Sequence, residues 1–281
     1  MKKYLPLSMF WLTIIALISM TIDHLGIFLD FSGLYSNVDV IYFMRIIGRI
    51  AFILYAFFIV QGVLYTSSFW KYMGRLGMLG LIMFIVDVFV FYRISSPFAG
   101  TNIFITLIAG AMLVYYFHEQ QYKHVYLLLP ALYLLILDLF NIFTNLSIPN
   151  YISGMYGFYG VIVISGFYGA YLLARRYINN LVEARYSEDL LVEQKYFQMS
   201  YNALASLTLL LITIILFIIS IVWPKADLVN YSIQGWGLLA TIPIMLYNGE
   251  LGYNKKWWKI FTYAYYPSHL LIFGIIILLL N

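Results

Sequence analysis

The stretch PLSMFWLTIIALISMTIDHLGIF, residues 6–28, decides the class of the fold because it is long and apolar enough to cross a bilayer. A spanning helix needs about 20 mostly apolar residues. Two ionisable side chains, Asp23 and His24, stand side by side near its end. Lys2 and Lys3 precede the stretch, but it is longer than the apolar core of a signal peptide and no small-residue cleavage site follows it. We therefore expect a retained transmembrane helix.

The rest of the chain has the same character. Of its 281 residues, 63% are hydrophobic and 10% are charged, whereas soluble domains are about 45–50% apolar and about 25% charged. The chain has no cysteine, which excludes disulfides, thiolate metal sites and cysteine nucleophiles. Its net charge of +4 comes without a basic run or tail, so we expect no nucleic-acid partner. The composition predicts an integral membrane protein among membrane lipids.

About nine segments are long and apolar enough to span, and they predict an all-α, polytopic helical bundle that forms a single transmembrane domain over residues 1–281. A cytoplasmic N-terminus places twelve of the sixteen Lys and Arg residues in inside loops, as the positive-inside rule requires. Residues 176–200 predict a cytoplasmic amphipathic connection, although a solvated linker fits equally well. The nine segments lie near residues 6–28, 40–65, 73–93, 101–118, 124–142, 153–175, 201–223, 231–248 and 257–280.

Several ionisable side chains fall inside the predicted spans. Each ionised group at the bilayer centre costs about 2.5–3.5 kcal/mol, so pairing or a watery cavity must stabilise it. The predicted topology places most of these groups in the outer half of the membrane, so we expect them to line one cavity. The group consists of Asp23, His24, Arg45, Arg49, Asp87, Asp138 and His269.

The spacing of these side chains limits how they pair. Arg45 and Arg49 are four residues apart and share a helix face, so they need an acid such as Asp23 or Asp87. Neighbouring helical residues point about 100° apart, so we expect Asp23 to pair with an arginine rather than to orient His24. An Asp–Arg pair that only holds two helices together is the structural alternative. We expect Asp138, near the interface, to reach water.

The sequence contains no phosphate-cradling glycine loop, no metal-ligand spacing and no serine elbow. We therefore expect no metal. Runs of small residues, such as GRLGMLG (74–80) and SGMYGFYG (153–160), predict close helix packing. A histidine such as His269 in the last span suits proton transfer because imidazole titrates near neutral pH.

Four stretches occur in an order, at spacings and in spans that resemble the TraX family: TIDHLG (21–26), RIIGRIAFILYAFFIVQG (45–62), GTNIFITLIAG (100–110) and YYPSHLLIFG (265–274). LYNGELG (246–252) also looks like the pattern of the family. The family consists of polytopic bacterial membrane proteins, typified by an enzyme that acetylates the N-terminus of conjugative pilin. It is similar in turn to membrane acyltransferase family 3, whose members modify cell-surface sugars.

The resemblance implies a membrane-bound acyltransferase in the bacterial cytoplasmic membrane, inner or sole. It implies transfer of acetyl from cytoplasmic acetyl-CoA to an amine of a peptide or pilin N-terminus, or to a hydroxyl of a cell-surface glycan. We favour N-acetyl over O-acetyl transfer. The family's site corresponds to Asp23, His24, Arg49, Asn102 and His269, with His24 preferred as the base and His269 as the competing choice.

Other residues are assigned individually. We expect Arg45, Asp87 and Tyr266 to contact substrate beside Asn102. Basic residues at the cytoplasmic ends of the spans are candidates for the phosphates of CoA, with positive-inside topology alone as the alternative. These candidates are Lys255, Lys256, Arg175 and Arg176.

Two other classes of protein remain open at this stage. A transporter or flippase also uses intramembrane Asp, Arg and His for substrate paths and proton relays. The sequence shows no internal repeat with paired broken helices, which argues against a transporter. A non-catalytic scaffold would tolerate apolar replacement of its buried ion pair.

Overall fold

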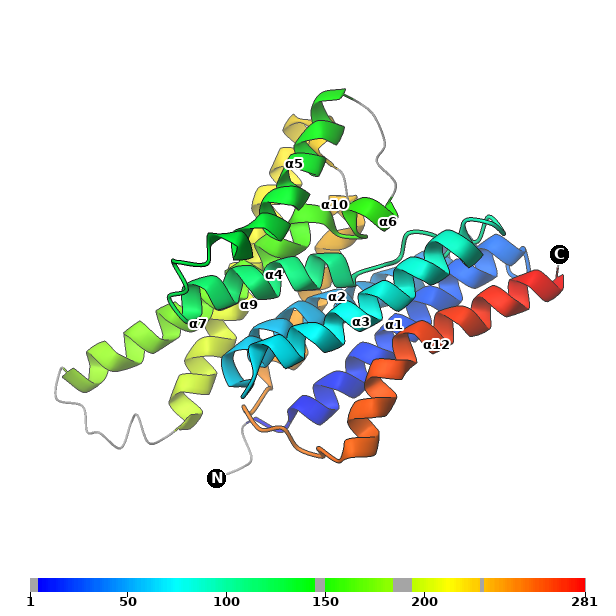
Figure 1. The fold of residues 1–281 in the computed structure, drawn as a ribbon. Helices are drawn as coiled ribbons and strands as arrows, with labels where there is room; N and C mark the ends of the chain where they lie inside the picture. The colour runs from blue at the N-terminus through cyan, green and yellow to red at the C-terminus, as the bar shows by residue number, and fades with distance from the viewer. Residues whose placement is uncertain (1–4, 145–149, 184–193, 228–229, 281) are drawn as a thin grey trace.

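The computed structural model describes residues 5–144, 150–183, 194–227 and 230–280, and within these ranges the named elements are all helical (Figure 1). Seven helices in them are long and apolar enough to cross a membrane. This confirms the predicted all-α, polytopic membrane bundle. The seven are α1 (Met9–Ser32), α2 (Val38–Tyr65), α3 (Phe69–Val86) with the π-helical turn η1 (Asp87–Phe91), the 3-10 turn η2 (Val125–Leu128) with α5 (Leu129–Thr144), α7 (Gly157–Glu183), α9 (Gln194–Val222) and α12 (Lys256–Leu280).

Two of the predicted spans take a different form. α4 (Phe104–His118) has 15 residues, or about 22 Å at 1.5 Å per residue, which is shorter than the roughly 30 Å hydrocarbon core. The span predicted at 231–248 is a succession of α10 (Tyr231–Gln234), 3-10 helix η4 (Gly235–Ala240) and α11 (Thr241–Met245). Glycines in η4 and a proline in α11 disfavour a regular helix. η4 packs against α2, and such protein contact is what permits irregular backbone at membrane depth.

α2 is the central helix of the bundle. It contacts α1, α4, α7 and η4, and it is the most buried of the long helices. α12 runs beside α1 on one side of the bundle, with α3 next to it (Figure 1). α7 packs between α4 and α9 on the other side. α5 and α9 are the least buried of the long helices, which suits contact with lipid.

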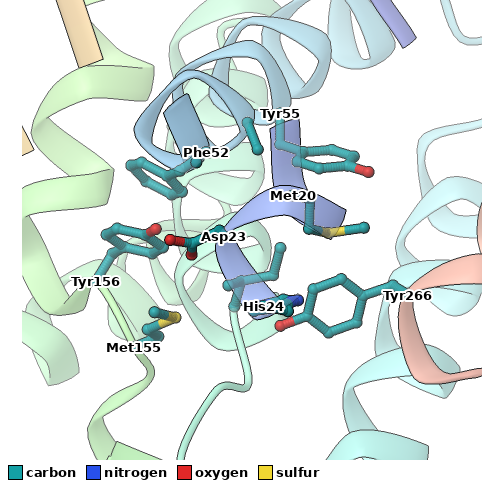
Figure 2. Close-up of a pocket in the computed structure, with 11 residues that line it drawn as sticks. Met20, Asp23, His24, Phe52, Tyr55, Met155, Tyr156 and Tyr266 are labelled. Carbon is teal, nitrogen blue, oxygen red and sulfur yellow. The ribbon is translucent and has the colours of Figure 1, made fainter. Parts of the chain in front are cut away.

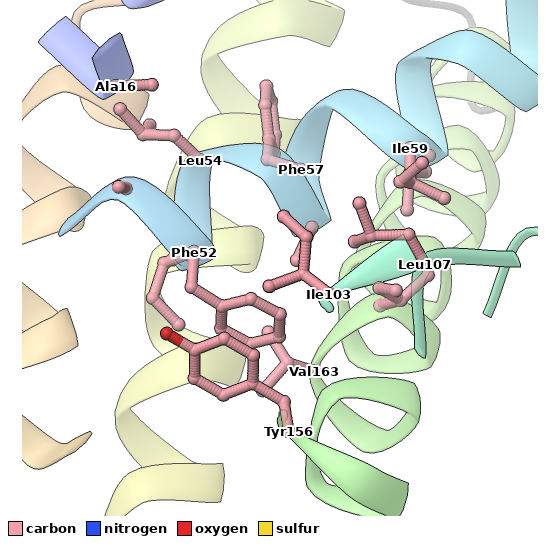
Figure 3. Packing of buried hydrophobic residues seen from close by; sticks show 14 of the residues in the cluster. Ala16, Phe52, Leu54, Phe57, Ile59, Ile103, Leu107, Tyr156 and Val163 are labelled. Atoms are coloured by element: carbon pink, nitrogen blue, oxygen red, sulfur yellow. The ribbon is translucent and has the colours of Figure 1, made fainter. Parts of the chain in front are cut away.

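Aromatic side chains fill the contact between α2 and α7 (Figure 3). The ring of Phe52 on α2 stacks on Tyr156, just before α7, with ring centroids 3.6 Å apart. Deeper in the bundle, Phe57 meets Phe167 edge to face and stacks on Tyr201. These large rings fix the position of α2 against the rest of the bundle.

The connection predicted at 176–200 belongs largely to two helices. α7 continues to Glu183 and α9 begins at Gln194, so both are longer than predicted. Residues 184–193, the middle of the predicted connection, lie outside the described residues.

The LYNGELG motif joins the start of α1 to α9. The backbone N–H of Leu7 donates to Leu246 O at 3.1 Å, and that of Asn248 donates to Leu7 O at 2.8 Å. The side chain of Asn202 on α9 donates to Tyr247 O at 2.7 Å. The motif is therefore fixed at the end of the bundle that is predicted to be cytoplasmic.

Candidate active site

The first feature of the site is a buried ion pair between α1 and α2. Arg49 Nη2 donates to both carboxylate oxygens of Asp23, each at 2.6 Å. Arg45 Nη1 lies 3.0 Å from Asp23 Oδ1. Arg49 is 2% exposed and Asp23 is 5% exposed, so water hardly screens the pair. The prediction that Asp23 pairs with an arginine is confirmed, and both arginines share this one acid.

Gly48 lets α1 and α2 approach closely enough for this pair. A Cβ atom at position 48 would overlap the side chain of Asp23. The glycine in GRIAF therefore has a packing role that directly supports the ion pair.

Replacing Gly48 with alanine is expected to destabilise the protein. The added methyl group must displace Asp23, and such overpacking typically lowers stability by about 1–3 kcal/mol. The matched control is Gly74→Ala on α3, where a Cβ would meet nothing within 4 Å and where alanine favours the helix. Thermal unfolding of the two purified variants in detergent checks this. Equal melting temperatures would show that the close approach is not needed.

The second feature is a direct contact between two histidines on α1 and α12. His24 Nδ1 lies 2.6 Å from His269 Nε2, and the rings stack with centroids 4.9 Å apart. His269 Nδ1 lies 2.7 Å from the carbonyl oxygen of Tyr265. A carbonyl oxygen can only accept, so Nδ1 of His269 carries a proton.

This contact fixes the tautomer of both neutral rings. With its proton on Nδ1, neutral His269 offers Nε2 as an acceptor, and His24 Nδ1 must donate to it. Neutral His24 then has no proton on Nε2. Nε2 of His24 on α1 is therefore a free basic nitrogen, and the hydrogen bond from Nδ1 to His269 on α12 holds the ring in place.

Asp23 and His24 both line a pocket between α1, α2 and the chain before α7 (Figure 2). We call it the reaction pocket. Its volume of about 20 Å³ holds one water-sized group, so substrates must displace side chains. Two methionines in the wall are flexible enough to move. The remaining lining residues are Met20, Gly48, Ala51, Phe52, Tyr55, Ile103, Met155, Tyr156 and Tyr266.

Two predicted substrate-binding residues instead hold the turn before α4. Asn102 Nδ2 donates to Gly80 O at 3.0 Å, and its Oδ1 accepts from the N–H of Phe104 at 3.1 Å. Asp87 Oδ1 accepts from the N–H of Gly100 at 3.3 Å. Both side chains are buried, and neither is among the lining residues of the reaction pocket. They position the turn whose next residue, Ile103, lines the pocket.

Tyr266 and Arg45 lie at the site in different ways. The hydroxyl of Tyr266 donates to the carbonyl of Thr101, which ties α12 to the same turn. The Tyr266 ring lines the reaction pocket and meets the ring of His24 edge to face. Arg45 is not in the pocket wall, and its side chain is 24% exposed at the edge of the ion pair.

The structure does not bring the four predicted CoA-binding residues together. Lys255 and Lys256 are exposed at the start of α12. Arg175 and Arg176 are exposed on α7, and Arg175 lines a separate cavity beside α4. None of the four lines the reaction pocket.

Sequence reasoning missed several contacts of the site. Met155 and Tyr156 line the pocket, although their run SGMYGFYG predicted packing alone. Asp138 Oδ2 accepts from the N–H of Phe158 at 2.8 Å, so it caps the start of α7, where the helix dipole favours a carboxylate. The described residues contain no group of three or more His, Cys, Asp or Glu side chains placed to hold a metal ion.

Comparison with known proteins adds one finding to this geometry. A family model described as "TraX protein" matches residues 8–234, which is most of the chain and includes the ion pair and His24. The range ends before His269. No curated protein and no solved structure matches the chain.

Proposed function

The chain belongs to the TraX family, and from that premise we propose that it is a multi-pass membrane acetyltransferase. The donor is cytoplasmic acetyl-CoA, and the acceptor is an amine such as the N-terminus of a peptide or pilin. We place the protein in the bacterial cytoplasmic membrane. The observation that carries the proposal is the buried His24, whose ring is fixed by His269 and lines the reaction pocket beside Asp23.

The chemistry of acetyl transfer needs one base and one source of positive charge. The amine nitrogen attacks the thioester carbon, the C–S bond breaks, and one proton moves from nitrogen to the leaving sulfur. The products are an N-acetyl group and free CoA. His24 Nε2 accepts the proton from the amine and returns it to sulfur, and such general-base help is typically worth about 10²–10⁴-fold.

The ion pair supplies the positive charge. Arg45 and Arg49 carry two positive charges against the one negative charge of Asp23, which leaves a net +1 beside the pocket. In a buried site a fixed positive charge stabilises the oxyanion that forms on the thioester carbonyl. Asp23 holds the arginines in place. If the pair takes part in catalysis, a double variant that replaces both partners is stable but has low activity. If the pair only joins two helices, the same double variant is stable and active.

Transfer of labelled acetyl from acetyl-CoA by the purified full-length protein in nanodiscs tests the proposal. The acceptor is a peptide with a free N-terminal amine, and its matched control is the same peptide with the N-terminus already acetylated. We expect label on the free-amine peptide alone. Label on a glycan hydroxyl but not on the amine would replace the N-acetyl assignment with an O-acetyl one. Absence of transfer to either acceptor class would contradict the enzymatic proposal and favour a transporter.

Replacing His269 is expected to lower kcat without changing the KM for acetyl-CoA. Its ring acts through His24, so His269→Ala leaves the His24 Nδ1 proton without its acceptor and frees the tautomer. We expect a loss of about 10–100-fold, comparable to the loss of an orienting partner. His269→Gln offers a carbonyl oxygen to the same proton and is expected to recover part of kcat. The control is His124→Ala, which changes an exposed histidine. A fall in kcat that His269→Gln does not relieve would mean a purely structural role.

A further inference from the structure

Three cavities follow one another from the reaction pocket towards the end of the bundle that is predicted to be cytoplasmic. The middle cavity has a volume of about 170 Å³ and the outer cavity about 540 Å³. Tyr55, Ile103 and Tyr266 line both the reaction pocket and the middle cavity. The middle and outer cavities share the residues Thr13, Phe58, Tyr72 and Tyr263. The shared walls place the three cavities next to one another in a row, which we call the path.

The outer cavity lies where the cytoplasmic ends of several helices meet. Its wall includes the start of α1, the end of α2 and the start of α3. The LYNGELG motif contributes Tyr247, Gly249 and Leu251 to the same wall. Along α1, the path from Met9 in the outer cavity to His24 covers roughly 22 Å at 1.5 Å per residue. The LYNGELG motif contributes no residue to the reaction pocket, so its place in the wall of the outer cavity is the role that the pocket left open.

The walls of the path change in character along its length. The middle cavity is lined mainly by apolar side chains and tyrosines. The outer cavity adds one cation, Arg75, whose guanidinium carbon lies 5.7 Å from the centre of the Tyr72 ring. In the described part of the chain, no carboxylate forms an ion pair with Arg75. An exposed guanidinium that stacks on an aromatic ring is well suited to phosphate.

We propose that this path is the binding site for acetyl-CoA. The phosphates and nucleotide occupy the outer cavity at Arg75, the long thin arm passes through the middle cavity, and the thioester reaches the reaction pocket. The inference rests on the proposed function and adds the place of the donor and the residue that recognises it. It assigns the phosphates to Arg75 rather than to the four basic residues that the sequence offered as candidates, Lys255, Lys256, Arg175 and Arg176.

Direct binding of CoA to the purified full-length protein is the first test. Loss of a charged hydrogen bond to phosphate weakens binding by roughly tenfold or more, so Arg75→Gln is expected to raise the Kd for CoA about tenfold. The matched control is Lys71→Gln, which removes an exposed cation from the same end of α3 but not from the cavity wall. The control is expected to keep the wild-type Kd.

Thiol labelling is the second test, and it measures whether acetyl-CoA occupies the middle of the path. The chain has no cysteine, so Thr13→Cys introduces a single thiol where the middle and outer cavities meet. A small water-soluble thiol reagent is expected to label it, and acetyl-CoA is expected to protect it. Lys71→Cys, outside the path, is expected to be labelled equally with and without acetyl-CoA.

The outcomes separate this inference from the proposed function. If acetyl transfer and CoA binding are normal but Thr13→Cys is unprotected and Arg75→Gln binds like Lys71→Gln, the donor enters elsewhere and the inference is overturned. If the wild-type protein binds no CoA, the proposed function and the inference fall together. Protection of Thr13→Cys with a raised Kd for Arg75→Gln supports the assigned path.

Discussion

Replacing His24 with alanine is expected to lower kcat for acetyl transfer by about 10²–10⁴-fold, the usual worth of a general base. The variant removes the nitrogen that accepts the proton of the amine, while the proposed CoA path through Arg75 stays intact. We therefore expect the Kd for CoA to stay close to that of the wild type. Initial rates at saturating donor, together with CoA binding, measure both quantities on one preparation.

A second variant separates chemistry from folding at this position. In His24→Asn the side-chain amide lies where Nδ1 of the ring lay and can still donate to Nε2 of His269, but it cannot accept a proton at neutral pH. We expect wild-type thermal stability and the same loss of kcat as in His24→Ala. Full activity in both His24→Ala and His269→Ala would remove the catalytic assignment.

Breaking the ion pair between α1 and α2 is expected to have the largest effect on stability. Asp23→Leu leaves Arg49, which is 2% exposed, without its carboxylate. An uncompensated buried charge typically lowers the free energy of unfolding by about 3–5 kcal/mol. Arg45 is partly exposed and can turn towards solvent, so it contributes little to this loss. Thermal unfolding in detergent measures the change.

The double variant Asp23→Leu with Arg49→Met tests what the pair is for. Apolar side chains of similar volume often replace a buried ion pair without loss of stability, so we expect the melting temperature to recover. We expect acetyl transfer to stay low, because the buried guanidinium of Arg49 is gone and the remaining positive charge, on the partly exposed Arg45, is no longer held by Asp23. A double variant with full stability and full activity would show that the pair only joins two helices.

The sequence predicts where the chain can cross the membrane better than it predicts whether each crossing is one regular helix. The long apolar helices follow from length and hydropathy, which depend on local composition. The irregular segment at 231–245 does not, because its 3-10 form depends on contact between η4 and α2. The short α4 likewise depends on the turn before it, which Asn102 and Asp87 hold in place.

Contacts between side chains on different helices also differ in how far the sequence predicts them. Asp23 with Arg49 was predictable because both are charged, apolar surroundings force pairing, and few partners exist. The contact of His24 with His269 was not, since the two lie 245 residues apart and their meeting depends on how α12 rotates against α1. Arg75 is one of the exposed basic residues near the start of α3, and only its place in the cavity wall distinguishes it from its neighbour Lys71.

A structure of the protein with acetyl-CoA or an unreactive analogue tests the central claim most directly. The quantity to measure is the distance from the thioester carbon to His24 Nε2. The base must lie about 2.6–3.2 Å from the amine nitrogen, and that nitrogen about 3–3.5 Å from the thioester carbon, so we predict a distance within about 7 Å. The phosphates are predicted to lie at Arg75. A thioester bound outside the reaction pocket, beyond reach of His24, would contradict the account.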